Sequence, residues 1–254
     1  MELGLSSWSL HREIDEKTSM LEFIRLAKKE FGLCQVELCS RHFASIEREY
    51  LDEVKKTLEE FGVKVANMPM MVGNISSEDA LQWEYDIAEI SKWFAAARHI
   101  GSFAIRVNTR GKDTEEETVR RVIDGYRALL PAAHRTGVHL LLENHGGVSK
   151  DPDIIARIMT EIDDEFFGTC PDLGNFPDEI RYEALARISP FMQMAHIKTY
   201  EFDEAGNETT IDVDRAFEIF RDAGYDGVVS IEYEGKGEER DGVRKSIALA
   251  KKFL

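Results

Sequence analysis

Four side chains of types that bind metal ions stand in or at the ends of short apolar runs in the second half of the chain. Glu143 ends the run HLLLE, Asp172 ends GTCPD, His196 lies in MAHIK, and Glu232 ends VVSIE. Short apolar runs bounded by polar or glycine-containing segments indicate buried β-strands. In parallel β/α barrels, chemistry takes place at the carboxyl ends of the strands. We therefore expect the four side chains to meet at one rim.

These four residue types favour a site for a divalent cation. A carboxylate at the end of an apolar strand is costly to bury alone, and three carboxylates in one mouth would repel each other and raise their pKa values. A divalent cation removes both problems. Two Glu, one Asp and one His form an oxygen-rich set that suits Mn²⁺, Mg²⁺ or Co²⁺, and Zn²⁺ also accepts such ligands. The sequence predicts one such ion, with Mn²⁺ or Mg²⁺ favoured, bound by Glu143, Asp172, His196 and Glu232.

The elements that must position these residues alternate regularly along the chain. Predicted strands cover Leu3–Trp8, Leu33–Cys39, Val63–Met68, Phe103–Asn108, Val138–Glu143, Phe167–Asp172, Met192–Lys198 and Gly227–Glu232. Predicted helices cover Thr18–Glu30, Ile46–Glu60, Glu78–His99, Glu115–Arg135, Asp153–Ile162, Ile180–Ile188, Val213–Ala223 and Gly242–Phe253. Alternating strands and helices predict a parallel sheet, and eight such units in about 250 residues match a barrel. We therefore predict an α/β protein, a single (β/α)8 TIM-barrel domain over residues 1–254.

Residues at the expected helix ends agree with this arrangement. Glycines follow four of the helical runs, where a left-handed cap is favoured; they are Gly32, Gly62, Gly137 and Gly224. Residues that cap helix N-termini precede four runs; they are Ser77, Thr114, Asp151 and Asp212. A doubly wound dinucleotide-binding sheet is the alternative fold, but no GxGxxG motif follows the first predicted strand.

Six further side chains fall near the same predicted rim and could contact a substrate. They are Lys198, His145, Arg106, Asn108, His42 and Trp8. His145 follows Glu143 by two residues and so points the same way; it either contacts the substrate or caps the Gly146-Gly147 turn. Trp8 either forms an apolar wall of the site or packs in the core.

Charged residues on the second and fourth predicted strands leave alternatives open. Arg106 and Asn108 share one strand face. Arg106 either binds a substrate carboxylate or pairs with Glu143. Glu37 either pairs with Arg106 or Lys198, or acts as a catalyst.

Composition excludes several classes of protein. The chain has 254 residues, of which 43% are hydrophobic, and its formal net charge is −16. Such an acidic surface repels phosphate backbones and anionic lipids, which argues against nucleic-acid and membrane partners. The three cysteines form no CxxC pair, and the N-terminus lacks the features of a signal peptide. We expect a cytoplasmic protein with a small-molecule partner. The sequence leaves open whether the protein forms a homo-oligomer.

Several segments of the chain resemble a known family. LLLENHGG, CPDLGNF, MAHIKTY and GVVSIEYEG resemble strands five to eight of the xylose isomerase-like TIM-barrel superfamily, and in particular its sugar phosphate isomerase/epimerase branch. LGLSSWSL and VELCSRHF resemble the first two strands of the family more loosely. The resemblance covers essentially the whole chain, and its second-half motifs are specific as a set and weak one by one.

The resemblance implies an activity. It carries the metal ligands of the family onto the four residues named above, and it implies that Glu143 and Glu232 form an acid/base pair. The expected function is that of a metal-dependent isomerase or epimerase of a sugar or cyclitol. Such an enzyme removes a proton next to a carbonyl and passes through a metal-stabilised enediolate.

The sequence also departs from the ketose 3-epimerases of this family. Asn175 stands where they have a histidine, and no arginine follows His196 closely. Lys198 is then the expected contact for a substrate hydroxyl or oxyanion. The first alternative is a lyase on the same site, of the inosose or dehydroshikimate dehydratase type. A more distant one, an apurinic-site endonuclease, needs more histidine ligands and a basic groove.

Overall fold

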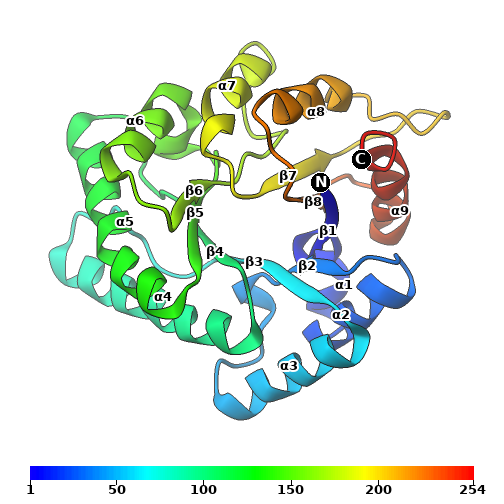
Figure 1. The fold of residues 1–254 in the computed structure, drawn as a ribbon, viewed down its shortest axis with the longest axis horizontal. Helices are drawn as coiled ribbons and strands as arrows, with labels where there is room; N and C mark the ends of the chain where they lie inside the picture. The colour runs from blue at the N-terminus through cyan, green and yellow to red at the C-terminus, as the bar shows by residue number, and fades with distance from the viewer.

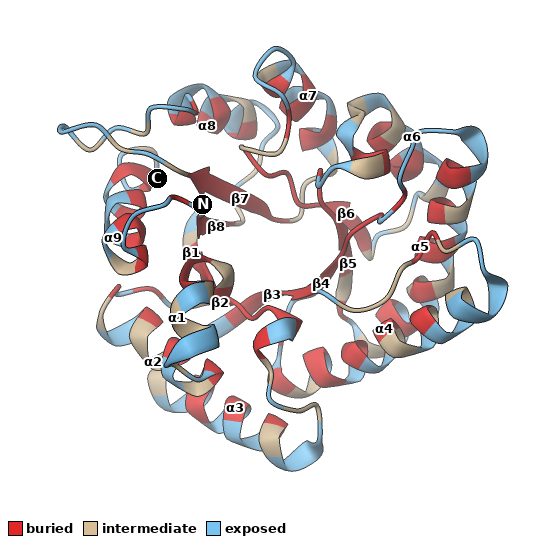
Figure 2. Ribbon diagram, turned by 180° about the vertical axis from the view of Figure 1, so that it is seen from behind, coloured by how far each residue is buried: buried red, intermediate tan, exposed pale blue.

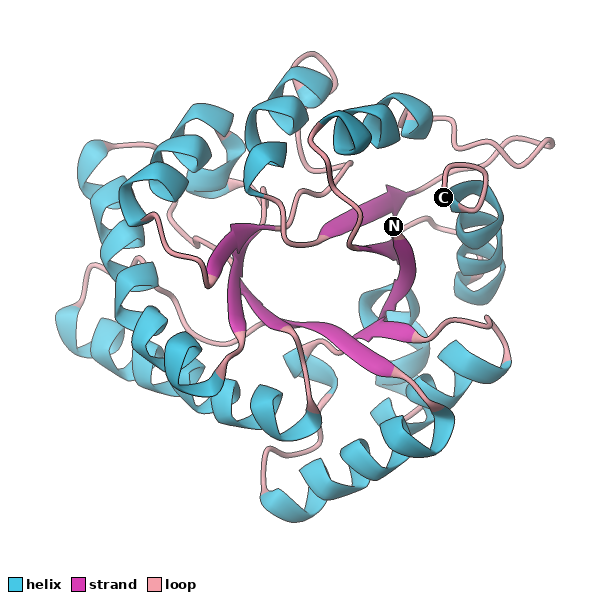
Figure 3. Cartoon of the chain, viewed as in Figure 1, coloured by secondary structure: helices cyan, strands magenta, loops and turns pink.

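The chain forms a ring of eight parallel strands enclosed by helices. The computed structural model describes all 254 residues, and the ring is seen end-on in Figures 1 and 3. The strands are β1 (Glu2–Ser6), β2 (Gln35–Glu37), β3 (Lys64–Met70), β4 (Ala104–Val107), β5 (His139–Leu142), β6 (Phe167–Thr169), β7 (Ala195–Thr199) and β8 (Val228–Tyr233). The fold is therefore the α/β barrel that the alternation of elements predicts.

Nine α-helices connect the strands or follow them. They are α1 (His11–Glu16), α2 (Met20–Lys29), α3 (Arg48–Phe61), α4 (Ala80–Ile100), α5 (Glu116–Thr136), α6 (Pro152–Ile162), α7 (Arg181–Ile188), α8 (Val213–Asp222) and α9 (Glu239–Ala250). Four short 3-10 helices complete the set: η1 (Ser7–Leu10), η2 (Ser40–His42), η3 (Gly147–Lys150) and η4 (Ser189–Phe191). No helix is long and apolar enough to cross a membrane.

Strand order within the sheet is β6-β5-β4-β3-β2-β1-β8-β7. The ring closes between β6 and β7 through isolated bridges rather than a continuous ladder, and these pair Thr169 with Met192 and Asp172 with His196. The backbone N–H of His196 donates to the carbonyl of Pro171 at 2.9 Å. Two of the predicted metal ligands therefore lie on the seam that closes the barrel.

The main hydrophobic core lies between the strands and the helices. Figure 2 shows the buried inner faces of the helices turned toward the ring. Helix α8, for example, buries Val213, Ala216, Phe217 and Phe220, which is the spacing of one helix face. A second, small cluster of Ala66, Ala104, Leu141, Cys170 and Met194 is separate from this core. Its members come from β3, β4 and β5 and from the chain next to β6 and β7.

Element boundaries differ from the sequence prediction at several points. The first strand ends at Ser6, so Trp8 lies in η1, and the sixth ends at Thr169, so Asp172 lies in the following loop. Helix α4 is capped by Asp79 rather than Ser77, and α5 begins after Glu115 rather than Thr114. At α4 the Asp79 side chain accepts a hydrogen bond from the backbone N–H of Gln82 and so caps the helix, whereas Glu115 precedes α5 without a side-chain cap.

Close packing of α5 against the loop after β3 gives a test of the fold. A Cβ atom on Gly125 would lie 2.4 Å from the carbonyl oxygen of Ile75. We expect Gly125→Ala to destabilise the protein by about 1–3 kcal/mol through overpacking, which exceeds the gain in helix propensity. The midpoint of thermal unfolding should fall by at least about 2 °C, measured by circular dichroism. Asp124→Ala at the exposed neighbouring position is the control, and an equal midpoint for both variants would contradict this packing.

Candidate metal centre and substrate site

Four elements bring the predicted ligands together at one place in the barrel. Glu143 directly follows β5, Asp172 lies in the loop after β6, His196 is in β7 and Glu232 is in β8. One ligand atom from each residue lies within 4.8 Å of the others. All four side chains are buried. The set is thus a candidate metal site formed by residues that lie far apart in the sequence.

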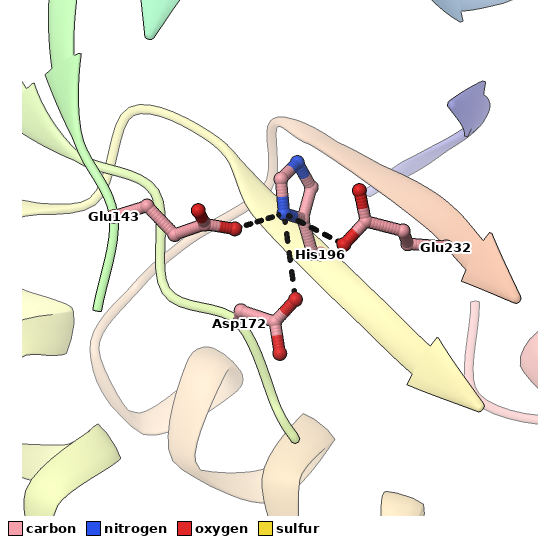
Figure 4. Close-up of side chains that lie close together, drawn as sticks. All are labelled: Glu143, Asp172, His196 and Glu232. Atoms are coloured by element: carbon pink, nitrogen blue, oxygen red, sulfur yellow. Dashed lines mark hydrogen bonds and ion pairs between the residues drawn. The ribbon is translucent and has the colours of Figure 1, made fainter. Parts of the chain in front are cut away.

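The Nδ1 atom of His196 lies at the centre of this cluster. It is 2.9 Å from Oε1 of Glu143, 3.6 Å from Oδ2 of Asp172 and 3.7 Å from Oε2 of Glu232 (Figure 4). Burial lowers the pKa of His196, but Cys170, Glu37 and Glu232 raise it more, so it stands well above its usual value. The surrounding negative potential therefore favours a positive charge at this point.

The other ring nitrogen of His196 faces a carboxyl group on β2. Nε2 lies 3.0 Å from Oε2 of Glu37, and Nδ2 of Asn67 donates to the same oxygen at 2.7 Å. With Nε2–H donating a hydrogen bond to Glu37, Nδ1 is the ring nitrogen that would coordinate a metal. The sequence suggested Arg106 or Lys198 as the partner of Glu37, and the structure gives it His196 instead. Asn67 was not assigned to the site from the sequence, although a polar residue within the predicted third strand is a sign of a buried polar contact.

Two buried cations pair with the two predicted proton-transfer residues. Nη1 of Arg106 pairs with Oε2 of Glu143. Nζ of Lys198 lies 2.5 Å from Oε2 of Glu232, 3.2 Å from Oδ2 of Asp172 and 3.1 Å from Oε1 of Glu234. Of the two roles left open for Arg106, the structure therefore contains the ion pair with Glu143.

Lys198 and Glu232 shift each other's titration. Burial lowers the pKa of Lys198, but Asp172 and Glu232 outweigh it, so the pKa lies well above the ordinary value. Burial raises the pKa of Glu232, but Lys198 and His196 outweigh it, so the pKa lies well below the ordinary value. Both side chains are therefore charged near neutral pH.

The charges and donors at this site fit a divalent cation. Four buried carboxyl groups, those of Glu37, Glu143, Asp172 and Glu232, lie within 3.7 Å of His196. Arg106 and Lys198 are the only permanent cations paired with these groups. In addition, Oδ2 of Asp172 is buried and accepts no hydrogen bond. A mixed set of carboxylate oxygens and one imidazole nitrogen can hold a divalent ion of the Mg²⁺, Mn²⁺ or Zn²⁺ type.

His145 and Asn108 border the cluster on the β4–β5 side. Nδ1 of His145 lies 2.9 Å from Oε2 of Glu143, and its side chain is 52% exposed. Partial burial, together with the nearby Arg106, lowers the pKa of His145 to about 4, so the ring is neutral at pH 7. Asn108 is buried, and its Oδ1 accepts no hydrogen bond. Whether either residue contacts a substrate stays a prediction.

Trp8 and His42 lie side by side, one step away from the four ligands. The Trp8 ring stacks on His11, and its Nε1 donates to Oε1 of Glu234 at 2.8 Å. The His42 side chain is fully buried, 6.2 Å from the Trp8 ring between centroids, and its Nδ1 lies 3.1 Å from Oγ of Ser7. Burial lowers the pKa of His42 to about 4. Glu234 pairs with Lys198 and so links Trp8 to that side chain, and His42 makes no contact with the four ligands.

This fold and this cluster define a class of protein, a β/α barrel with a carboxylate-rich candidate metal site inside the ring of strands. Residues 24–253 match the family described as xylose isomerase-like TIM barrel. The chain belongs to this family. No curated protein matches the sequence.

Solved structures agree with this fold at low sequence identity. The 3-keto-D-glucoside 4-epimerase YcjR from E. coli is 20% identical, with 98% of each chain covered and a TM-score of 0.79. The IOLI protein, solved with a bound zinc atom, is 17% identical over 100% of this chain and 96% of its own, with a TM-score of 0.79. The probable 3-DHS dehydratase AsbF from Bacillus anthracis is 16% identical over 99% of each chain, also with a TM-score of 0.79.

Metal binding should be visible as thermal stabilisation. A ligand that binds only the folded state stabilises it, by about 2.7 kcal/mol at 100 times its Kd. We expect saturating Mn²⁺ to raise the unfolding midpoint of the metal-free protein by several degrees, and Asp172→Asn to remove most of that rise. Asp222→Asn, at an exposed position on α8, is the control and should keep it. A midpoint that does not respond to any divalent cation would contradict the metal site.

The contact between Glu37 and His196 predicts a role in metal affinity. Glu37→Gln keeps a hydrogen-bond acceptor but removes the negative charge beside the imidazole. Loss of such an outer partner costs about 10-fold to 100-fold in metal affinity, and we expect a change of that size by isothermal titration calorimetry with Mn²⁺. Glu2→Gln removes the same charge at an exposed position at the start of the neighbouring strand β1, and as the control it should leave the affinity unchanged. Unchanged affinity in Glu37→Gln would show that the contact does not support the ligand.

Proposed function

We propose that this protein is a divalent-metal-dependent isomerase or epimerase of a sugar or cyclitol, which acts by moving a proton at the carbon next to a carbonyl. One observation carries the proposal. Glu143 and Glu232 approach His196 from opposite sides of the cluster (Figure 4), so a substrate between them would meet one carboxyl group on each face. We place the activity in a single domain over residues 1–254 of a cytoplasmic protein.

The metal would be held by Glu143, Asp172, His196 and Glu232. A bound divalent cation, with Mn²⁺ or Mg²⁺ favoured, supplies Lewis-acid stabilisation of negative charge that develops on substrate oxygens. Glu37 holds the imidazole of His196 with Nδ1 toward the carboxylates. The zinc atom in the IOLI structure supports a divalent ion in this fold.

Proton transfer is assigned to the two glutamates. One carboxylate accepts the proton from the carbon next to the carbonyl, and the other returns a proton. Return to the opposite face of the same carbon gives an epimer, and return to the neighbouring carbon gives an aldose–ketose isomer. The epimerase name of the E. coli structure supports the first outcome.

The remaining polar side chains would bind and orient the substrate. Lys198 has an ammonium group among three carboxylates, where it can donate a hydrogen bond to a substrate hydroxyl or oxyanion. Arg106, His145 and Asn108 lie on the other side of the cluster and offer further polar contacts. Trp8 would form part of the wall of the site.

The lyase alternative is supported by a separate observation. Nζ of Lys198 lies 2.5 Å from Oε2 of Glu232, so a proton donor stands beside a candidate acid/base group. In a dehydratase, such a donor would protonate a leaving β-hydroxyl after the first proton is removed. The AsbF structure, a probable dehydratase, has the same fold. No observation favours an endonuclease, because His196 is the only histidine in the metal cluster and the net charge is −16.

Hydrogen exchange in D2O tests the proposed chemistry without knowledge of the product. Proton abstraction next to a carbonyl should place deuterium at that carbon, and mass spectrometry of a panel of ketoses, 3-keto-glycosides and inososes with Mn²⁺ detects it. Glu143→Gln and Glu232→Gln should each lower turnover by at least about 100-fold. Glu201→Gln, at an exposed position after β7, is the control and should keep full activity.

The same panel separates the alternatives. Exchange with recovery of a stereoisomer indicates an epimerase, and exchange with loss of water indicates a lyase. Near-full activity in both metal-loaded glutamate variants would show that Glu143 and Glu232 do not transfer protons and act only as metal ligands. Absence of exchange with every member of the panel would count against proton abstraction from these substrate classes.

A further inference from the structure

A large cavity lies at the opposite end of the barrel from the carboxylates. It has a volume of about 670 Å³. Gln35, Lys64 and Val228, each the first residue of its strand, line it together with Phe103 and Met194, which directly precede β4 and β7. Because the strands are parallel, these positions mark the amino end of the ring. The cavity then continues along the C-terminal ends of α3 and α4, where Leu58 and Ile100 line it.

A layer of apolar residues separates this cavity from the candidate metal site. Ala66 and Met194 line the cavity and pack with Leu141 and Cys170 in the small cluster inside the barrel. On the other side of that layer, Sγ of Cys170 lies 3.6 Å from Nε2 of His196. The cavity is therefore a separate space with a closed floor and is not a second entrance to the candidate active site.

The cavity walls are mostly apolar and include an exposed aromatic ring. Leu58, Val63, Ile100 and Phe103 are among the lining residues. Phe103 is 44% exposed and stacks on His139 with ring centroids 4.4 Å apart. Exposure of so large an apolar side chain inside a cavity has a free-energy cost in water, and that cost is recovered when an apolar group covers the ring.

The lining of the cavity has more cationic than acidic side chains. Lys55, Lys64 and Arg98 line the cavity, with Glu59 as the one acidic residue. Neither lysine forms an ion pair with a carboxylate, and Arg98 donates to the carbonyl oxygen of Thr136 at 2.8 Å. On a chain with a net charge of −16, three cations beside an apolar cavity form a local positive region that attracts an anion.

We infer that this cavity is a second small-molecule site, which binds an amphipathic organic anion. The ligand would be an aromatic or aliphatic body, held against Phe103 and the apolar wall, with one acidic group near Lys55, Lys64 and Arg98. The volume lies within the range of about 300–1,000 Å³ that small-molecule sites occupy. The inference involves none of the proposed metal ligands, so it stands or falls separately from the proposed function.

Two fluorescent probes of matching shape test the site on the metal-loaded protein. The anion 8-anilinonaphthalene-1-sulfonate carries a sulfonate on an aromatic body, and N-phenyl-1-naphthylamine has the same body without the charge. We expect the anion to bind saturably with one site per chain. The double variant Lys55→Gln/Lys64→Gln should weaken its binding about threefold to tenfold, the scale of two partly exposed charge contacts. The neutral probe should bind the variant and the wild type alike.

Two further variants locate the binding site. Lys56→Gln/Lys251→Gln removes the same charge at exposed positions that do not line the cavity, and it should leave the affinity for the anion unchanged. Phe103→Ala should weaken both probes, because both lose the aromatic contact. Circular dichroism and thermal unfolding of each variant establish that the fold is intact.

Other outcomes would overturn the inference. They are the absence of saturable binding, equal weakening by the Lys55/Lys64 and Lys56/Lys251 variants, and an affinity that Phe103→Ala does not change. A fourth outcome that would overturn the inference comes from sedimentation velocity. If the protein is a dimer that Lys55→Gln/Lys64→Gln dissociates, the cavity is covered by a second copy of the chain rather than by a small molecule.

Discussion

The burial of four carboxyl groups around one imidazole is the constraint on which the rest of this structure depends. Glu37, Glu143, Asp172 and Glu232 all lie within 3.7 Å of a ring nitrogen of His196. Desolvation and mutual repulsion make such a group unstable unless positive charge compensates it. Arg106 and Lys198 supply two cations, and a divalent ion would supply the remainder. The chemistry we propose uses the same charge balance, because it needs carboxylates next to a Lewis acid.

Closure of the barrel brings two members of this cluster together. The seam between β6 and β7 has only isolated bridges, and one of them pairs Asp172 with His196. Every other pair of neighbouring strands in the ring is joined by a ladder of several residue pairs, and the register shifts within one of them, between Val36 and Glu37 in the β2–β3 ladder. A metal ion bound by Asp172 and His196 would therefore stabilise the closure between β6 and β7, where the backbone pairing is limited to isolated bridges. This coupling gives a physical reason to expect that the ion stabilises the fold as well as serving the reaction.

The two ends of the ring differ in chemistry. The carboxyl end is polar and has nearly every buried charged group of the barrel interior. The amino end has a small cluster of apolar residues next to a cavity lined by lysines and Phe103. Solved structures of an epimerase, a probable dehydratase and a zinc-bound protein share the fold at 16–20% identity. A fold shared at this distance does not fix a reaction, so the side chains around His196 must decide it.

The sequence by itself determined the class of fold and the types of side chain at the site. Strand and helix periodicity predicted the eight-unit barrel, and alternation along the strands put Glu143, His196 and Glu232 on inward faces. The tertiary structure decided which residues meet. It paired Glu37 with His196 rather than with Arg106 or Lys198, put Asp172 in a loop beyond β6, and buried His42 behind Trp8. Periodicity tells which way a side chain points, but contacts across a barrel depend on strand register and stagger, and these follow from packing of the whole ring.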